Sequence, residues 1–156
     1  WLGTFEKPQE NHYHEAIEAL KKMGIAHLQD KAYSRISAGE LQQVSIARVI
    51  AQRVRFILMD EPTAHLDYGN QLKVLRIVQT MADEGYGIVM TTHNPDQVLL
   101  LGGKVAIFDT ESRFHYGRWD EILSDSLLES IYGVKLQICE IDNVKRKVCI
   151  APSINK

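Results

Sequence analysis

Two apolar runs that end in polar residues, with an amphipathic segment between them, constrain the fold of this chain more than any other feature. The runs are residues 55–62, RFILMDEP, and residues 87–93, GIVMTTH. Apolar side chains of the segment between them recur on one face of a helix: Val74, Leu75, Val78, Met81 and Ala82. A buried strand, a crossover helix and a second apolar strand form a parallel unit, so the sequence predicts an α/β fold with a mostly parallel sheet flanked by helices.

The chain is long enough and apolar enough to bury the core that such a sheet needs. It has 156 residues, of which 45% are hydrophobic, and this suits one globular domain. Before the first run, residues 13–24 have amphipathic helical spacing that ends at a glycine, and residues 37–52 form a second predicted helix. After the second run, we expect a hairpin at 104–117, two short helices at 119–133 and a strand pair at 134–152.

Charge, hydropathy and cysteine content exclude several classes of protein. Eighteen basic against twenty acidic residues give a formal charge of −2, so no polycationic surface indicates binding to nucleic acid. The longest apolar runs fall far short of the ~20 residues that a membrane helix needs. Cys139 and Cys149 are too few for a disulfide framework, so we expect free thiols in a reducing compartment.

The segment ISAGE, residues 36–40, allows two interpretations at the start of the second helix. Ser37 and Glu40 have the S-x-x-E spacing of a capping box, in which each side chain satisfies a backbone N–H of the first turn. Ala38 and Gly39 leave backbone N–H groups uncovered at the positive end of the helix dipole, where a phosphate could approach closely. The first interpretation needs no ligand, and these four residues alone leave both open.

Polar residues gather where the two predicted strands end. In open α/β sheets, ligands bind beyond the carboxyl ends of the strands. Adjacent acids at a strand end alternate in direction, so one can hold a metal-bound water while the other meets a nucleophilic water. Taken singly, acids often just end a strand at a solvated edge, and a histidine there is often an ordinary surface residue. The polar residues expected at this rim are Asp60, Glu61, Thr91, Thr92 and His93.

Four short motifs in a fixed order carry a resemblance to a known family. They are ISAGE at 36–40, FILMDEP at 56–62, AHLD at 64–67 and TTH at 91–93. In this order the chain resembles the C-terminal half of the ATP-binding cassette (ABC) ATPases. The four motifs stand in the places of the family's LSGGQ signature, its Walker B acids, its D-loop and its switch-histidine loop.

The resemblance implies how the signature segment would act. Two such domains form a head-to-tail homodimer that holds two ATP molecules between them. Ser37 and Gly39 would then contact the γ-phosphate of a nucleotide bound mainly to the partner, with the helix N-terminus adding its dipole. Ala38 departs from the family's usual glycine and Glu40 from its glutamine, so we expect a weakened contact rather than a lost one.

The other three motifs receive roles from the same resemblance. Asp60 would hold Mg²⁺ through water, and Glu61 would position or deprotonate the attacking water, because phosphoryl transfer needs in-line placement and charge stabilisation. His93 would contact the γ-phosphate. Asp67 would carry signals across the dimer interface.

Several parts of the family's nucleotide site are missing from the sequence, since its glutamine loop and its adenine-stacking aromatic would also belong before Trp1. The phosphate loop, G-x-x-x-x-G-K-[S/T], occurs nowhere in these residues. We therefore expect a P-loop NTPase-type fold without its phosphate-loop portion, and a chain that hydrolyses no ATP by itself. Its expected parts are the helical subdomain and signature helix at 1–52, the α/β core at 53–118 and the C-terminal helices and strands at 119–156.

Segments outside the motifs resemble importer ATPases of the iron-siderophore, haem and cobalamin group. That resemblance implies a subunit docked on membrane permeases at the cytoplasmic face of the cell membrane, without direct contact to the transported substrate. No residue here can therefore identify the substrate. Two alternatives stay open: an ABC ATPase that clamps another assembly, such as nucleic acid, and a degenerate non-enzymatic partner of an intact ABC subunit. The near-neutral charge argues against the nucleic-acid clamp.

Overall fold

The computed structural model describes residues 7–153, which fall into two compact units divided between Thr92 and His93. Each unit is described by itself. No helix within the described residues has the length and apolar character to cross a membrane. Both cysteines are free thiols, as expected.

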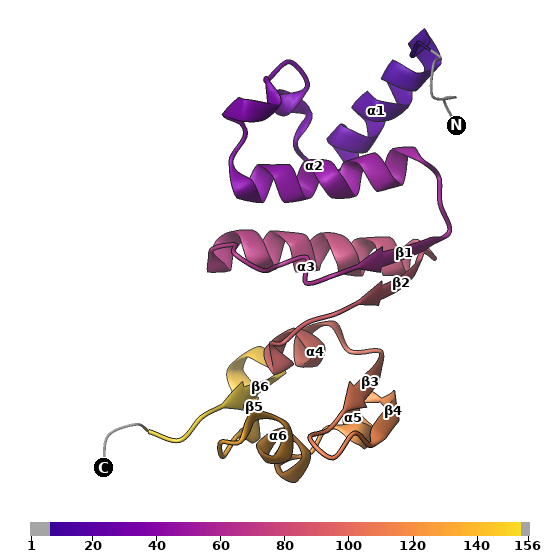
Figure 1. Ribbon diagram of the computed structural model, residues 1–156. Coiled ribbons are helices and arrows are strands. Elements are labelled where there is room, and N and C mark those ends of the chain that lie inside the picture. The colour runs from indigo at the N-terminus through magenta and orange to yellow at the C-terminus, as the bar shows by residue number, and fades with distance from the viewer. Residues whose placement is uncertain (1–6, 154–156) are drawn as a thin grey trace. The chain divides into compact units, whose positions relative to one another are not determined.

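The first unit contains three helices and one parallel strand pair (Figure 1). Helix α1 packs on α2, and two short 3₁₀ turns, η1 and η2, connect them. The α1 helix leads to Gly24, whose φ of +69° suits the expected glycine stop. The elements of this unit are α1 (Glu10–Lys22), η1 (Ala26–Leu28), η2 (Tyr33–Arg35), α2 (Ala38–Ala51), β1 (Phe56–Met59), α3 (Tyr68–Asp83) and β2 (Gly87–Met90).

The predicted strand, helix, strand unit is confirmed. Strands β1 and β2 pair in parallel, with Phe56 opposite Gly87 and Met59 opposite Met90. Helix α3 forms the crossover and buries the apolar face that its spacing predicts, except at Ala82, which is exposed. The buried side chains of α3 are Val74, Leu75, Val78 and Met81.

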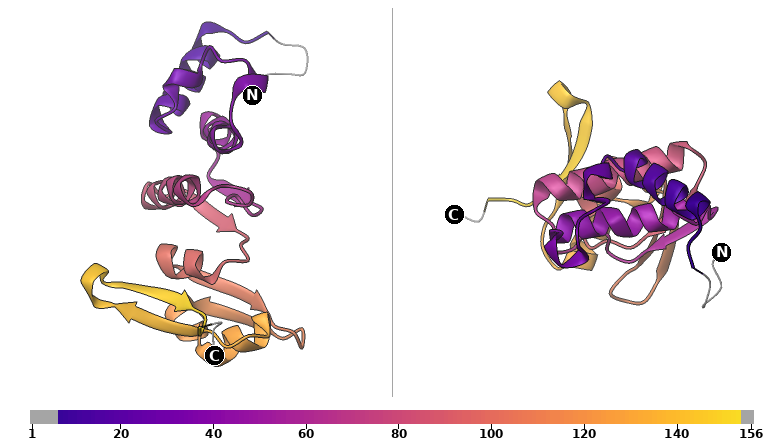
Figure 2. Two further views of the ribbon diagram at one scale, coloured as in Figure 1. Left: turned by 90° about the vertical axis from the view of Figure 1, so that its left-hand side faces the viewer. Right: turned by 90° about the horizontal axis from the view of Figure 1, so that it is seen from above.

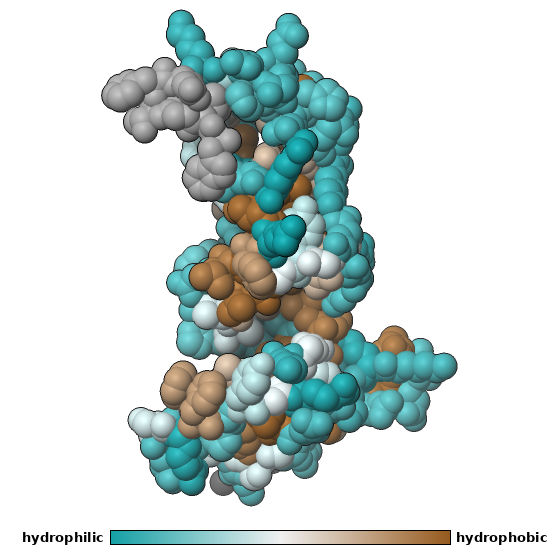
Figure 3. Space-filling model, turned by 90° about the vertical axis from the view of Figure 1, so that its right-hand side faces the viewer, coloured by the Kyte–Doolittle hydropathy of each residue, from teal (hydrophilic) through white to brown (hydrophobic). Residues whose placement is uncertain are grey.

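The prediction that the first strand, β1, is buried is wrong. Phe56 and Leu58 are 80% and 81% exposed, and Val89 on the neighbouring strand is 62% exposed. Successive strand side chains alternate between the two faces, and only Ile57 of β1, at 3% exposed, points into the core. Phe56, Leu58 and Val89 are therefore exposed on a strand pair that has no further strand among the described residues. Hydrophobic surface open to solvent is visible in Figure 3.

The second unit has two antiparallel hairpins and three helices, and the β5–β6 hairpin is seen clearly in Figure 2. The predicted hairpin, short helices and final strand pair are all confirmed. Strand β6 packs against α4, a helix that sequence analysis did not predict. The elements are α4 (Pro95–Leu101), β3 (Lys104–Phe108), β4 (Phe114–Arg118), α5 (Trp119–Ile122), α6 (Asp125–Tyr132), β5 (Gln137–Ile141), η3 (Asp142–Val144) and β6 (Arg146–Ile150).

A buried carboxylate fixes the turn between β3 and β4. The side chain of Asp109 is 1% exposed and accepts hydrogen bonds from Arg113 Nε at 2.8 Å and from the Arg113 backbone N–H at 2.9 Å. His115 Nε2 lies 3.0 Å from the same carboxylate. The bonds from His115 and Arg113 hold the pKa of Asp109 far below its usual range, so the turn carries a permanent buried charge that is fully paired.

Candidate functional site

Thr91 joins the two acids that follow β1. Its hydroxyl donates a hydrogen bond to Asp60 Oδ1 at 2.6 Å and accepts one from the Glu61 backbone N–H at 2.9 Å. The backbone N–H of Thr91 also donates to Met59 O at 2.9 Å, which continues the parallel pairing past the end of β2. The expected convergence of Asp60, Glu61 and Thr91 at the carboxyl ends of the strands is therefore present in the first unit.

Glu61 has an unusual backbone conformation. Its φ is +41°, in the left-handed region that a residue with a Cβ seldom occupies. Asp60 and Glu61 therefore do not alternate as residues of a continuing strand; the chain turns sharply at Glu61 instead. Thr91 supports this turn by accepting the Glu61 N–H, and both acids remain exposed at the surface. Strained backbone of this kind clusters at functional sites.

The capping-box interpretation of Ser37 and Glu40 is confirmed. The Ser37 backbone N–H donates to Glu40 Oε2 at 2.9 Å, and the Glu40 backbone N–H donates to Ser37 Oγ at 3.3 Å. Two basic side chains face the other carboxylate oxygen, Lys31 Nζ at 3.5 Å and His27 Nε2 at 3.7 Å. The hydrogen bonds from Ser37, with Lys31 adding to them, lower the pKa of Glu40 to about 2. The first turn of α2 thus carries a permanent carboxylate.

Gly39 contacts the residue that links the signature segment to the D-loop segment. A Cβ at Gly39 would lie 2.8 Å from Asn70 Nδ2 and 2.9 Å from Asn70 Cγ, so only glycine leaves room for this amide. The same amide donates to Asp67 Oδ2 at 2.5 Å, and the Asn70 backbone N–H donates to Asp67 Oδ1 at 3.0 Å. Asp67 is the N-cap of α3, and the N–H groups of Asn70 lower its pKa.

The signature segment is therefore less open than expected. Gly39 is buried, whereas Ser37 and Ala38 are exposed. The expectation of uncovered backbone at both Ala38 and Gly39 is wrong for Gly39, because the Asn70 side chain fills the space beside it. Ser37 and Ala38 are the exposed residues at this helix start, and the Ser37 backbone N–H is already bonded to Glu40.

His93 belongs to the second unit, where its backbone is held from α6. Tyr132 Oη donates a hydrogen bond to His93 O at 2.8 Å. Asn94 then caps α4, with its Oδ1 accepting from the Asp96 N–H at 2.9 Å. The side chain of Asp96 accepts from the Cys149 backbone N–H of β6 at 2.7 Å.

Three residues that organise the predicted site residues were not singled out for a role from the sequence. Thr91 was expected at the rim, but not as the link between the acids. Its position as a polar residue directly after the apolar run 87–90 was the sequence signal that placed Thr91 at the rim. Asn70 follows an aspartate at the N-cap spacing, which indicates a capping bond but not the contact with Gly39. Nothing in the sequence around Tyr132 indicates its bond to His93.

The oxygen atoms of Asp60 and Thr91 are the kind of donor that Mg²⁺ prefers. Within residues 7–153, no group of three or more His, Cys, Asp or Glu side chains could hold a metal ion. Mg²⁺ usually keeps several waters and is bound through one or two carboxylates together with substrate phosphates. A carboxylate fixed by a hydroxyl at a strand end fits that mode of binding.

Comparison with known proteins finds similar chains. The family model for the ABC transporter domain matches residues 4–64. The chain is 33% identical over 136 residues to a molybdate import ATP-binding protein of Haemophilus influenzae, covering 86% of this chain and 53% of that protein. It is also 33% identical over 130 residues to a hemin import ATP-binding protein of Roseobacter denitrificans, covering 78% of this chain and 50% of that protein.

A solved structure extends the match over almost the whole chain. It is an inward-facing conformation of a metal-chelate type ABC transporter, with a TM-score of 0.88 and 28% sequence identity. The match covers 98% of this chain and 62% of that one. The chain spans about half the length of the curated relatives it matches. These matches confirm the expected fold, and the chain belongs to the family of ABC transporter ATP-binding proteins.

Proposed function

We propose that the native protein couples ATP hydrolysis to import through a membrane permease, and that this chain supplies its signature segment and its hydrolytic residues. The observation that carries the proposal is the bonding of Thr91 to both Asp60 and Glu61, which fixes two acids at the carboxyl end of a parallel strand pair. Family membership gives this arrangement its reaction class, since ATP hydrolysis is a phosphoryl transfer to water.

The two acids take different parts in this reaction. Glu61, which has a left-handed backbone conformation, positions or deprotonates the attacking water. Asp60, held by the Thr91 hydroxyl, binds Mg²⁺ through water. The ion, when bound, neutralises charge that develops on the phosphate oxygens. His93 contacts the γ-phosphate from the loop that begins the second unit.

The signature segment acts on the nucleotide of a second copy in a head-to-tail dimer. Exposed Ser37 offers its hydroxyl, and exposed Ala38 offers its backbone N–H, at the start of α2. The negative charge of Glu40 repels an approaching phosphate. The positive charges of Lys31 and of protonated His27 lie beside the Glu40 carboxylate and partly cancel this repulsion. Asn70 lies beside Gly39 and donates a hydrogen bond to Asp67. A movement of the signature segment would therefore be transmitted to the D-loop segment through Asn70.

The transported cargo is proposed to be a metal chelate of the iron-siderophore, haem or cobalamin type. Support comes from the hemin import relative and from the metal-chelate type transporter structure. The molybdate import relative has the same 33% identity, so an oxyanion is the competing cargo. In either case the subunit would dock on its permease at the cytoplasmic face of the membrane and would not touch the cargo.

One experiment tests the cargo and the coupling together. The native protein would be reconstituted with its permease in liposomes, and ATP hydrolysis would be measured with haem, a ferric siderophore, cobalamin or molybdate supplied with the matching binding protein. Stimulation by one chelate alone supports the proposal. Stimulation by molybdate alone would replace the cargo, and hydrolysis that no permease affects would remove the transport role.

A second experiment addresses the phosphate loop, which is absent from residues 1–156. The coding DNA immediately upstream of the codon for Trp1 would be read in frame for a glycine-rich loop that ends in Lys-Ser or Lys-Thr. Its presence supports a complete hydrolytic subunit. A start codon in its place would favour the non-enzymatic partner role instead.

A further inference from the structure

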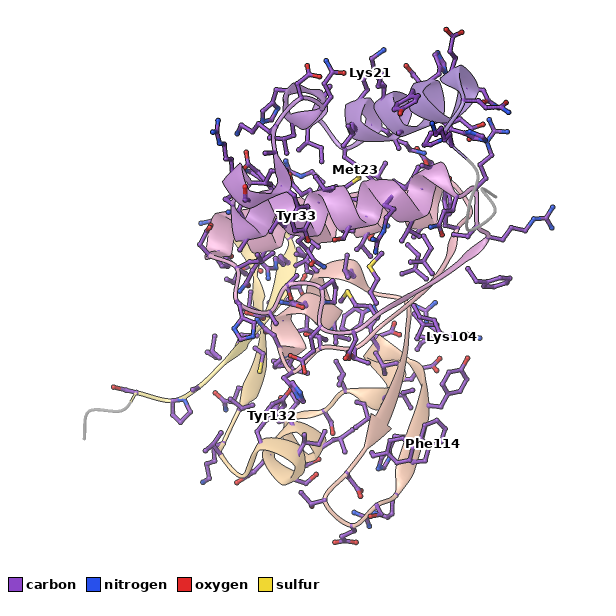
Figure 4. The ribbon with its side chains drawn as sticks, turned by 45° about the horizontal axis from the view of Figure 1, so that its top comes forward. Lys21, Met23, Tyr33, Lys104, Phe114 and Tyr132 are labelled. Carbon is purple, nitrogen blue, oxygen red and sulfur yellow. The ribbon has the colours of Figure 1, made fainter. Side chains whose placement is uncertain are left out.

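The backbone of His93 is held by a side chain from the C-terminal part of the second unit. Tyr132 is the last residue of α6 (Figure 4), and its hydroxyl reaches back 39 positions along the chain to donate to His93 O at 2.8 Å. The side chain of Tyr132 is 38% exposed, so most of it is covered. A tyrosine hydroxyl is protonated at neutral pH and can donate, and burial raises the pKa of the Tyr132 phenol further.

Helix α6 is itself well fixed at both ends. Ser124 Oγ accepts from the Leu127 backbone N–H at 3.2 Å at its start. Gly133, with φ of +68°, ends the helix directly after Tyr132. Leu128 is 2% exposed and anchors the helix in the core. The Tyr132 hydroxyl is therefore presented from a rigid element.

A second bond ties the same loop to the C-terminal hairpin. Asp96 lies in the first turn of α4, and its Oδ1 accepts from the Cys149 backbone N–H at 2.7 Å. The β5 strand is joined in turn to α6, because the Ile138 N–H donates to Asp125 Oδ1 at 2.9 Å. Residues on both sides of Asn94, the N-cap of α4, are thus bonded to the C-terminal segment 125–150.

We propose that Tyr132 is a positioning residue for His93, through which the C-terminal segment 125–150 controls the rate of ATP hydrolysis. The carbonyl that Tyr132 fixes is one peptide bond from the N-cap of α4, so the bond limits the backbone torsions that aim the His93 imidazole. If the His93 side chain is already oriented before the reaction, less conformational entropy is lost on reaching the reactive geometry. This inference rests on the proposed function of His93.

Positioning of this kind has a distinct kinetic signature. Loss of the hydroxyl leaves the nucleotide-binding groups unchanged but lets the His93 loop sample other conformations. We therefore expect kcat to fall while KM for ATP changes little. A residue that only stabilises the fold would lower the melting temperature and leave the kcat of the folded fraction unchanged.

The test compares two tyrosine variants of the native protein with its permease. Tyr132→Phe removes only the hydroxyl, and Tyr116→Phe removes the hydroxyl of an exposed tyrosine on β4 as the matched control. The expected result is a fall in kcat of about tenfold for Tyr132→Phe, with KM for ATP within about twofold, and no change for Tyr116→Phe. Equal kcat values for the two variants, or a Tyr132→Phe loss explained by a lower melting temperature, would overturn the inference.

A second pair of variants keeps the inference testable if Tyr132→Phe fails to fold. Asp96→Ala removes the acceptor for Cys149, whereas Asp96→Asn keeps an oxygen there. We expect Asp96→Ala to lower kcat and Asp96→Asn to restore it, and equal activity of the two would count against control by the C-terminal segment. Failure of the proposed hydrolytic activity looks different, because the unsubstituted protein would then hydrolyse no ATP at all.

Discussion

The hydroxyl of Thr91 lies 2.6 Å from Asp60 Oδ1 and at the same time accepts the backbone N–H of Glu61. Thr91 is separated from the two acids by 31 and 30 positions in the chain. One side chain therefore sets both the direction of the Asp60 carboxylate and the turn at Glu61. Neither acid is positioned by its own strand alone.

Replacement of Thr91 by valine removes this link at almost constant volume. We expect Thr91→Val to lower kcat of the native protein by about tenfold, because a hydrogen bond to a charged group contributes about 1.5–3 kcal/mol. Steady-state ATP hydrolysis measures the effect. Thr91→Ser keeps the hydroxyl and serves as the control, so equal losses in both variants would argue against the role of the hydroxyl.

Replacement of Glu61 by glutamine tests the proposed base. The substitution keeps the side-chain shape but removes the negative charge, and general acid–base catalysis contributes about 10²–10⁴-fold. We expect Glu61→Gln to abolish measurable turnover of the native protein while ATP binding, followed by equilibrium titration, stays unchanged. Turnover at the unsubstituted rate would remove Glu61 from the mechanism.

Gly39→Ala is expected to break the contact between the signature and D-loop segments. The new Cβ would lie 2.8 Å from Asn70 Nδ2, so the Asn70 amide must move and lose its bond to Asp67. We expect a loss of stability of about 1–3 kcal/mol, the usual cost of overpacking, measured by denaturant unfolding of the native protein. The Asn70→Ala substitution removes the amide that the new Cβ would contact. The double variant Gly39→Ala/Asn70→Ala should therefore be as stable as Asn70→Ala alone. A stable Gly39→Ala protein would show that this space is not tight.

Glu40 should make stability depend on pH in acid. Its pKa falls from an ordinary 4.5 to about 2 in the folded chain, mainly through the Ser37 N–H. A depressed carboxyl pKa adds stability above the unfolded value, and that stability is lost as pH falls from about 4.5 to about 2. Thermal melting of Glu40→Gln across this range should show a smaller decline than the unsubstituted protein. Parallel curves for the two proteins would contradict the assignment.

The sequence predicted the local features of this fold better than the contacts between distant residues. The capping box of Ser37 and Glu40 spans four residues, so their spacing was enough to suggest it. The bonds from Thr91 to Asp60 and from Tyr132 to His93 depend on how distant elements pack. The spacing of residues along the sequence therefore could not predict them. Periodicity also cannot tell which strand face is covered, which is why the exposure of Phe56 was not predicted.

Helix α4 was missed for a different reason. It has only seven residues, too few for a helical period to be recognised. Its start nevertheless has the expected chemistry, with Asn94 as the N-cap and Pro95 at the first helical position. Of the predicted site residues, Asp60 and Glu61 are brought together by Thr91, and Gly39 and Asp67 by Asn70. The roles in nucleotide binding given to them stay predictions.

The bond between Asp96 and Cys149 joins residues 53 positions apart, and the one between His93 and Tyr132 joins residues 39 positions apart. A ribosome synthesises the amino-terminal partner of each pair first. The loop that carries His93 is consequently synthesised before either of its restraints exists. These two bonds therefore cannot form until both Tyr132 and Cys149 have been synthesised.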